Sequence, residues 1–172
     1  MGAWGNTERQ SDHGLDLLEI IVARQLREVD FAAFNVSEAR ELLRQDTQNE
    51  IEQYRQKERP LALKEFYLET LMRSFIHAEV LIAECLADYY QTGELTIYDY
   101  VGENYDPIEY RIKDFIVSSA DFPPLLEVLR SVQSPEHWLY QFWRDEDTRQ
   151  RWLAHIQSVQ QNLKEHYEKV GL

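Results

Sequence analysis

Apolar residues recur every three or four positions along most of the chain, a spacing typical of α-helices that bury one face. The first such stripe predicts a helix from Ser11 to about Glu28. A second helix is predicted at 36–56, because Asn35 can cap its start and Glu38 stands where a capping box requires an acid. This helix is rich in charge, so we expect it to lie on the surface with one narrow stripe buried.

The third helical region, 61–90, is the most apolar part of the chain, and we expect it to be the central helix of the core. Arg59-Pro60 breaks the pattern before it, and Thr92-Gly93 follows it as a usual helix stop. Helical spacing then returns in the C-terminal third of the chain. Helices are predicted there at 124–132, at 134–143 after the cap Ser134-Pro135-Glu136, and at 153–170.

The segment 94–118 is compatible with two structures. Leu95–Val101 is β-branched and aromatic, and Ile108–Lys113 alternates apolar with polar residues, as the two strands of a hairpin would. However, Asp106-Pro107-Ile108-Glu109 also resembles a helix start, with a cap, a proline at the first helical position and an acid at the third. We favour the helix, and a short β-hairpin near 95–117 is the alternative.

Together these patterns predict a mainly α protein, a compact bundle of about six helices with or without the short hairpin. The chain has 172 residues, a length that fits one domain. No repeat, low-complexity tract or linker rich in glycine and proline divides it. We therefore expect a single helical domain, 1–172.

The chain carries 31 acidic and 18 basic residues, a net charge of −13. Such a charge repels nucleic acids and anionic membranes and attracts a basic protein. The longest apolar run, Phe75–Ala87, contains charges and is too short to span a bilayer, and the chain does not begin with a signal-peptide pattern. The single cysteine, Cys85, lies in this run and has no partner for an internal disulfide. We expect a cytoplasmic protein.

One carboxylate stands in the middle of the apolar stripe of the third helix. At about 100° per residue, Glu79 falls among the side chains between Met72 and Tyr90 that we expect to be buried. His77, Glu84 and Asp88 fall on the opposite side, which we expect to face solvent. Because an unpaired polar group costs roughly 2 to 7 kcal/mol to bury, some donor must satisfy Glu79.

The start of the chain offers such donors. Gly2 and Gly5 allow backbone N–H groups to approach another element closely, and Trp4 adds an indole N–H. We therefore expect the N-terminal loop to dock on Glu79 as a structural clasp. The alternatives are an acid at the edge of the core that reaches water and, less favoured, a catalytic acid.

Asp12, Asp16 and Glu19 share one flank of the first helix. Such a row could hold a hard cation, but acids in a first turn also stabilise a helix through its dipole. We favour this structural role because no ligand loop accompanies them, and we expect neither a metal nor a cofactor. Common motifs for nucleotide binding, zinc binding and acyl transfer are missing from the sequence, and we expect three histidines to lie singly on polar helices: His137, His155 and His166.

Met1–Gly5 resembles the N-terminal signature of a bacterial family catalogued as domain of unknown function 4259, whose members open G-x-W-G and continue into an N-D-D-A-x-D stretch. Asp12 and Asp16 match two of the acids in that stretch. Ala78–Ala83 is similar to the family's central A-A-E-V-x-A segment. The resemblance leaves the C-terminal half uncovered, and it implies the family's fold and a bacterial cytosolic setting rather than an activity.

Two functions are compatible with these features. The first is a non-enzymatic acidic module of the immunity or antitoxin type that captures a basic protein. The second is a metal-dependent hydrolase with ligands from two helices, Asp12, Asp16 and Glu79. For the first function, we expect the partner to contact acids of the second helix: Glu38, Glu41, Asp46, Glu50 and Glu52.

Aromatic residues gather near the predicted cap at Ser134. Such a cluster is more often part of a core than of an interface. If the protein forms a homodimer, however, we expect the contact at three residues of this cluster: Trp138, Phe142 and Trp143.

Overall fold

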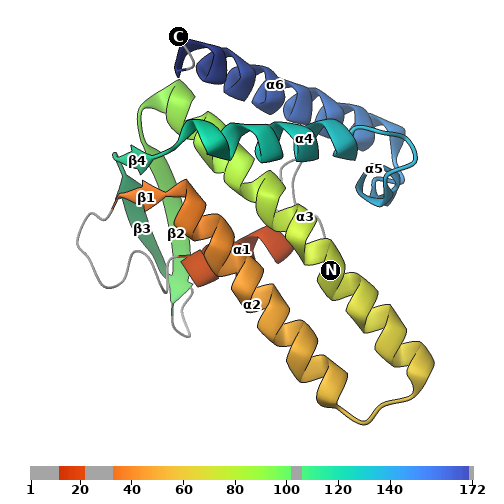
Figure 1. Ribbon diagram of the computed structural model, residues 1–172. Helices are drawn as coiled ribbons and strands as arrows, with labels where there is room; N and C mark the ends of the chain where they lie inside the picture. The colour runs from red at the N-terminus through yellow and green to blue at the C-terminus, as the bar shows by residue number, and fades with distance from the viewer. Residues whose placement is uncertain (1–11, 22–32, 102–105, 171–172) are drawn as a thin grey trace.

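The computed structural model describes residues 12–21, 33–101 and 106–170, which form a mainly α structure with two pairs of short strands (Figure 1). This confirms the predicted fold class, including the hairpin that we gave as the alternative. The elements are α1 (Asp12–Ile21), β1 (Phe34–Asn35), α2 (Val36–Gln56), α3 (Leu61–Thr92), β2 (Leu95–Val101), β3 (Asp106–Ile112), β4 (Phe115–Ile116), α4 (Phe122–Val132), α5 (Trp138–Phe142) and α6 (Glu146–Val170).

Helices α2 and α3 form an antiparallel pair, and α3 is the long axis around which the other elements are placed (Figure 1). The second half of α3 is packed against α1, α4, α6 and strand β2. The C-terminal end of α2 and the first half of α3 project away from these elements (Figure 1). We call residues 36–76 the arm and the other described residues the body.

The ends of α2 and α3 follow the predicted signals. Asn35 accepts a hydrogen bond from the backbone N–H of Glu38 at 3.2 Å and donates its amide N–H to the Glu38 carboxylate at 2.9 Å, which fixes the start of α2. Helix α3 ends at Gly93, whose φ of 80° lies in the left-handed region that glycine tolerates best. The N–H of Gly93 donates to the carbonyl of Tyr89 at 2.8 Å.

Strands β2 and β3 form an antiparallel hairpin, so the helix that we favoured at Asp106–Glu109 is wrong. Leu95 pairs with Ile112 at one end of the hairpin. Both side chains are buried, and this burial outweighs the local capping signal. Pro107 is compatible with the strand because a two-stranded sheet consists of two edges, where a missing N–H is tolerated.

A second, parallel strand pair joins β1 to β4, with Phe34 opposite Phe115. The two rings stack with 4.8 Å between their centroids. The sequence patterns did not predict this pair, because each strand has two residues and gives no periodic signal.

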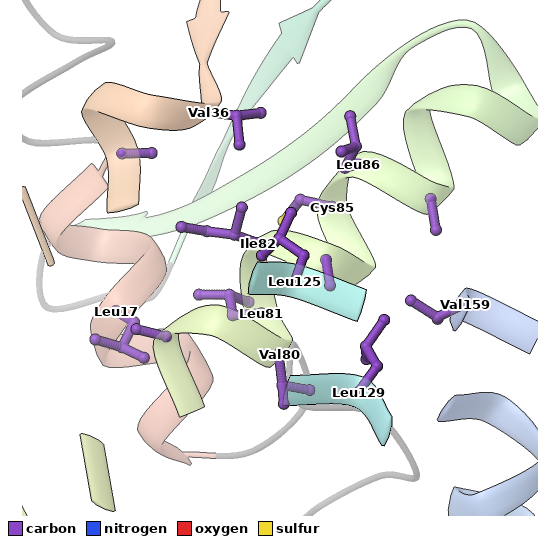
Figure 2. Packing of buried hydrophobic residues seen from close by; sticks show 14 of the residues in the cluster. Leu17, Val36, Val80, Leu81, Ile82, Cys85, Leu86, Leu125, Leu129 and Val159 are labelled. Carbon is purple, nitrogen blue, oxygen red and sulfur yellow. The ribbon is translucent and has the colours of Figure 1, made fainter. Parts of the chain in front are cut away.

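The core is built around the second half of α3. From Ala78 to Ala87 every residue of this helix is buried except Glu79. Each fully buried aliphatic side chain contributes roughly 1.5 to 3 kcal/mol to stability. Side chains from α1, α2, α4 and α6 surround this part of the helix (Figure 2): Leu17, Val36, Leu125, Leu129 and Val159.

The aromatic segment after α4 divides between core and surface. Trp143 is 9% exposed and packs against Trp152 of α6, with 6.1 Å between the ring centroids, whereas Phe142 is 49% exposed. The cap of α5 is His137, whose Nδ1 accepts from the N–H of Leu139 at 3.1 Å, rather than the predicted Ser134. Within the described residues, no helix combines the length and the apolar character needed to cross a lipid bilayer.

Candidate functional site

Glu79 lies where α3 faces the start of α2, and Arg40 holds its carboxylate. Nε of Arg40 donates to Oε2 at 2.7 Å and Nη2 donates to Oε1 at 2.9 Å, a bidentate ion pair. The two side chains are 22% and 25% exposed, so Glu79 is half-buried. The donor that the sequence demanded is thus supplied by α2. Gly2, Trp4 and Gly5 lie outside the described residues, and the N-terminal clasp stays a prediction.

Arg40 also faces a second carboxylate, Asp121, with 3.9 Å between Nη1 and Oδ1. Asp121 accepts hydrogen bonds from the hydroxyl of Ser37 at 2.6 Å and from the N–H and hydroxyl of Ser118, both at 2.8 Å. Burial by itself raises the pKa of Asp121, but these hydrogen bonds and the charge of Arg40 hold it below its ordinary value of 3.8. The hydrogen bond to Glu79 is the main reason that the pKa of Arg40 is raised.

This network joins α2, α3 and the turn before α4. Arg40 and Glu79 are separated by 39 positions in the sequence, and Ser37 and Asp121 by 84. No periodicity or motif indicates such a pairing. The sequence indicated only that Glu79 needs a hydrogen-bond donor, and it did not identify Arg40 as that donor.

The most deeply buried acid of α3 is Glu84, which we expected to face solvent. It is 3% exposed, and its Oε1 lies 2.9 Å from Nε2 of His155 on α6. The expectation is wrong because α6 covers the side of α3 that we took to be open. His77 and Asp88 are half-buried, and the ring of His77 packs against Trp138 at 5.1 Å.

The five acids predicted as a partner-binding face of α2 belong to two groups. Three of them accept hydrogen bonds from nearby side chains. Glu38 accepts from Asn35 and Glu52 accepts from Gln48. Glu41 accepts from both Arg44 and Gln45. The bonds from Arg44 and Gln45 lower the pKa of Glu41 to about 2.

Asp46 and Glu50 form the second group, together with Asp16 of the neighbouring helix α1. Burial raises the pKa of Glu50, and the negative charges of Asp46 and Asp16 raise it further, while Lys57 opposes them. Glu50 and Asp16 are exposed, and Asp46 is half-buried. The two helices therefore concentrate negative charge at one place on the surface, which we call the acidic cluster: Asp16, Asp46 and Glu50.

Among the described residues, no group of three or more histidines, cysteines, aspartates and glutamates could hold a metal ion. Glu79 is paired with Arg40, and Asp16 lies near Glu50 instead. The side chain of Asp12 is outside the described part of the chain. The metal-dependent hydrolase therefore stays a hypothesis, and no contact among the described residues favours it.

The first half of α3 differs from what the sequence predicted. We expected 61–90 to be the central helix of the core, with Met72 on its buried face, yet five large apolar side chains in its first twelve residues are 45–70% exposed. The apolar composition alone could not reveal this exposure, because it depends on which elements reach this part of the helix. These residues, which do not share one face of the helix, are Leu61, Leu63, Phe66, Tyr67 and Met72.

Charge is also distributed unevenly over the chain. The end of the arm, residues 53–64, carries four bases and one acid, a net charge of +3. The other residues therefore carry a net charge of −16. We call residues 53–64 the basic tip; its four cations are Arg55, Lys57, Arg59 and Lys64.

No family model, curated protein or solved structure matches the chain. The resemblance to domain of unknown function 4259 rests only on the residues quoted above. Function is therefore inferred from the surfaces of the protein itself.

Proposed function

We propose that the protein is a non-enzymatic, acidic protein-binding module of the immunity or antitoxin type that captures a basic protein. The observation that carries the proposal is the distribution of charge, with a net charge of −16 outside the basic tip. A field of this sign accelerates the encounter with a cationic protein and disfavours polyanions. Binding driven in this way weakens as the salt concentration rises.

The contact that we expect is the acidic cluster on α1 and α2. Burial raises the pKa of Glu50, and the negative charges of Asp46 and Asp16 raise it further. A lysine or arginine of a partner would relieve this repulsion on binding, which favours the cluster as the contact for a cationic protein.

The setting is part of the same proposal. A single-domain bacterial protein of the cytoplasm agrees with the N-terminal resemblance, with the lone buried cysteine Cys85 and with the continuous core cluster that residues from α1 to α6 form. A basic toxin or enzyme is the type of partner that the charge of the chain best complements.

The test is recovery of a partner from a lysate of the source organism at low salt. The baits are the wild type, a triple variant of the acidic cluster (Asp16→Lys, Asp46→Lys, Glu50→Lys) and a control with the same change in net charge. The control reverses three exposed acids elsewhere: Glu127→Lys, Glu136→Lys and Glu165→Lys. Circular dichroism checks that each bait is folded.

We expect the wild type and the control to recover the same basic protein, and the cluster variant to lose it. The purified pair should form a complex whose Kd increases with salt. Equal loss in both variants would show that only net charge matters and would remove the acidic cluster as the contact. If the wild type recovers no basic protein, the proposed function is wrong.

A further inference from the structure

The start of α5 depends on a single histidine. Nδ1 of His137 accepts a hydrogen bond from the backbone N–H of Leu139 at 3.1 Å and so caps the helix. Leu139 is 2% exposed, so without this cap its N–H would lack an acceptor in a place that water hardly reaches. Helix α5 has only five residues, and a helix this short has few hydrogen bonds of its own to hold its first turn.

This cap works only while the imidazole is neutral. A neutral ring has one N–H and one acceptor nitrogen, whereas a protonated ring has two N–H groups and no acceptor. Because Nδ1 is the acceptor here, the proton of the neutral ring lies on Nε2. A second proton would bind to Nδ1 and turn it into a donor that faces the N–H of Leu139. Protonation of His137 therefore replaces a hydrogen bond with a repulsive contact.

The groups that meet His137 from α3 do not favour a second cation. The ring of His137 is half-buried and packs against the indole of Trp138, with 5.6 Å between the centroids. Two side chains of α3 contact the same indole: Cζ of Arg73 lies 4.9 Å from its centroid, and the ring of His77 lies 5.1 Å from it. Both of these groups are basic, so neither supplies a negative charge to a protonated His137.

Among the described residues, no carboxylate forms an ion pair with His137. Several acids on the segments before and after α5 are bonded locally instead: Glu127 with Arg130, Glu136 with Ser134, Asp145 with Thr148 and Glu146 with Arg149. Burial lowers the pKa of His137 below its ordinary value of 6.5, which agrees with a site that favours the neutral ring.

We propose that His137 is an acid-sensitive cap, and that its protonation releases the first turn of α5 and detaches Trp138 from α3. Leu139 and Trp143 lie further along the segment, where both are buried, so they keep the rest of it in the core. The change is therefore local. Trp138 lies one turn before Phe142, which is 49% exposed, so the released indole enlarges the apolar surface at this place. The inference does not depend on the proposed capture of a basic protein.

The direction of the change with pH follows from the neutral cap. The unfolded chain takes up a proton on this histidine near pH 6.5, whereas the folded protein does so only at a lower pH. The contribution of the cap to stability is complete above pH 6.5 and is lost as the pH falls from there through the lower pKa of the folded protein. We expect Trp138 to be held at neutral pH and released in mildly acid solution.

The first experiment follows the tryptophans by ¹⁹F NMR of protein labelled with 5-fluorotryptophan, from neutral pH to about pH 4. Trp138→Phe identifies the signal of Trp138. We expect this signal to shift with a midpoint below 6.5 that matches the titration of the His137 ring, while the signal of Trp152, which is 1% exposed, stays constant. A Trp138 signal that does not change, or one that changes only together with that of Trp152, overturns the proposal.

Two variants identify the histidine that is responsible. His137→Asn supplies a side-chain oxygen that accepts from a backbone N–H and does not titrate, so Trp138 should stay in place over the whole pH range. His77→Asn is the matched control, because it removes the other histidine that contacts Trp138, and here the transition should persist. Circular dichroism checks that both variants are folded. A transition that persists in His137→Asn and is lost in His77→Asn would assign the effect to the wrong histidine and overturn the proposal.

The position of the proton on His137 gives a test that needs no variant. Long-range ¹H–¹⁵N correlation spectra of the wild type distinguish a protonated ring nitrogen from an unprotonated one. We expect the neutral ring of His137 to carry its proton on Nε2, with Nδ1 unprotonated. A neutral ring with its proton on Nδ1 could not accept from Leu139, and this result would also overturn the proposal.

Discussion

Replacing Arg40 with methionine tests whether the ion pair between α2 and α3 is what allows Glu79 to lie among the buried residues of α3. Methionine keeps most of the aliphatic length and removes the guanidinium. The change deprives Glu79 of two charge-assisted hydrogen bonds and Asp121 of its nearest described cation. Loss of one partner from a fully buried pair costs about 3 to 5 kcal/mol. Glu79 is 25% exposed and gains some hydration, so we expect a loss of about 2 to 3 kcal/mol in the free energy of unfolding.

The assay is urea denaturation at neutral pH, followed by circular dichroism, for a double-mutant cycle of Arg40→Met and Glu79→Gln. Glu79→Gln should cost less than Arg40→Met, because the guanidinium keeps Asp121 nearby when Glu79 loses its charge. We expect a coupling energy of about 1 to 2 kcal/mol between the two sites, as for side chains in direct contact. Arg44→Met is the matched control, since its pair with Glu41 is exposed and should contribute little to stability.

A coupling energy near zero, or a loss for Arg40→Met no larger than that for Arg44→Met, would refute the reasoning. Glu79 would then be satisfied by another donor, and the N-terminal clasp is the one that the sequence predicts. Trp4→Phe separates the two possibilities because it removes the indole N–H and keeps an aromatic ring. Coupling between Trp4→Phe and Glu79→Gln would show that the clasp contributes as well.

Three further predictions concern single positions. The pKa of Asp121 is held below 3.8 in the folded protein, so its ionised form stabilises the fold, and Asp121→Asn should destabilise the protein at neutral pH. The difference in the free energy of unfolding between variant and wild type should shrink as the pH falls below 3.8, which denaturation at a series of pH values measures. The pKa of Glu50 is raised, so its ionised form opposes folding. Glu50→Gln should therefore raise stability at neutral pH, only slightly because solvent screens this exposed side chain, and the gain should disappear below pH 4.5 in urea denaturation series. Gly93→Ala should lower stability by about 1 to 2 kcal/mol, because a side chain is strained at a φ of 80° even though no atom lies within 4 Å of an added Cβ. Thermal unfolding measures the change, and equal stability of the two proteins would contradict this account.

The sequence was most informative where local chemistry decides the structure. Asn35 with Glu38, and Thr92 with Gly93, mark helix ends through hydrogen bonds that span a few residues, and the structure confirms them. The helix predicted at Asp106–Glu109 is wrong because this segment carries both a helix-capping pattern and a strand pattern, and only the strand buries Ile112 against Leu95. Local signals cannot report how much apolar surface a segment will bury elsewhere.

Contacts between distant segments were beyond reach for the same reason. The helical wheel correctly singled out Glu79 as an acid that needs a donor. It could not identify Arg40, and it placed Glu84 in solvent because a wheel shows the faces of one helix and not what covers them. With α6 packed on α3, Glu84 is buried against His155, a histidine that we had expected to stand alone.

Helix α3 changes its environment along its length, and this change explains why the prediction of a buried helix failed for its first half. A wheel drawn over 61–90 averages two different environments. From Ala78 to Ala87 every side of the helix is buried except at Glu79, whereas between Leu61 and Met72 large apolar side chains remain exposed. Apolar composition cannot distinguish the two halves, because burial depends on which other elements of the fold reach each part of the helix.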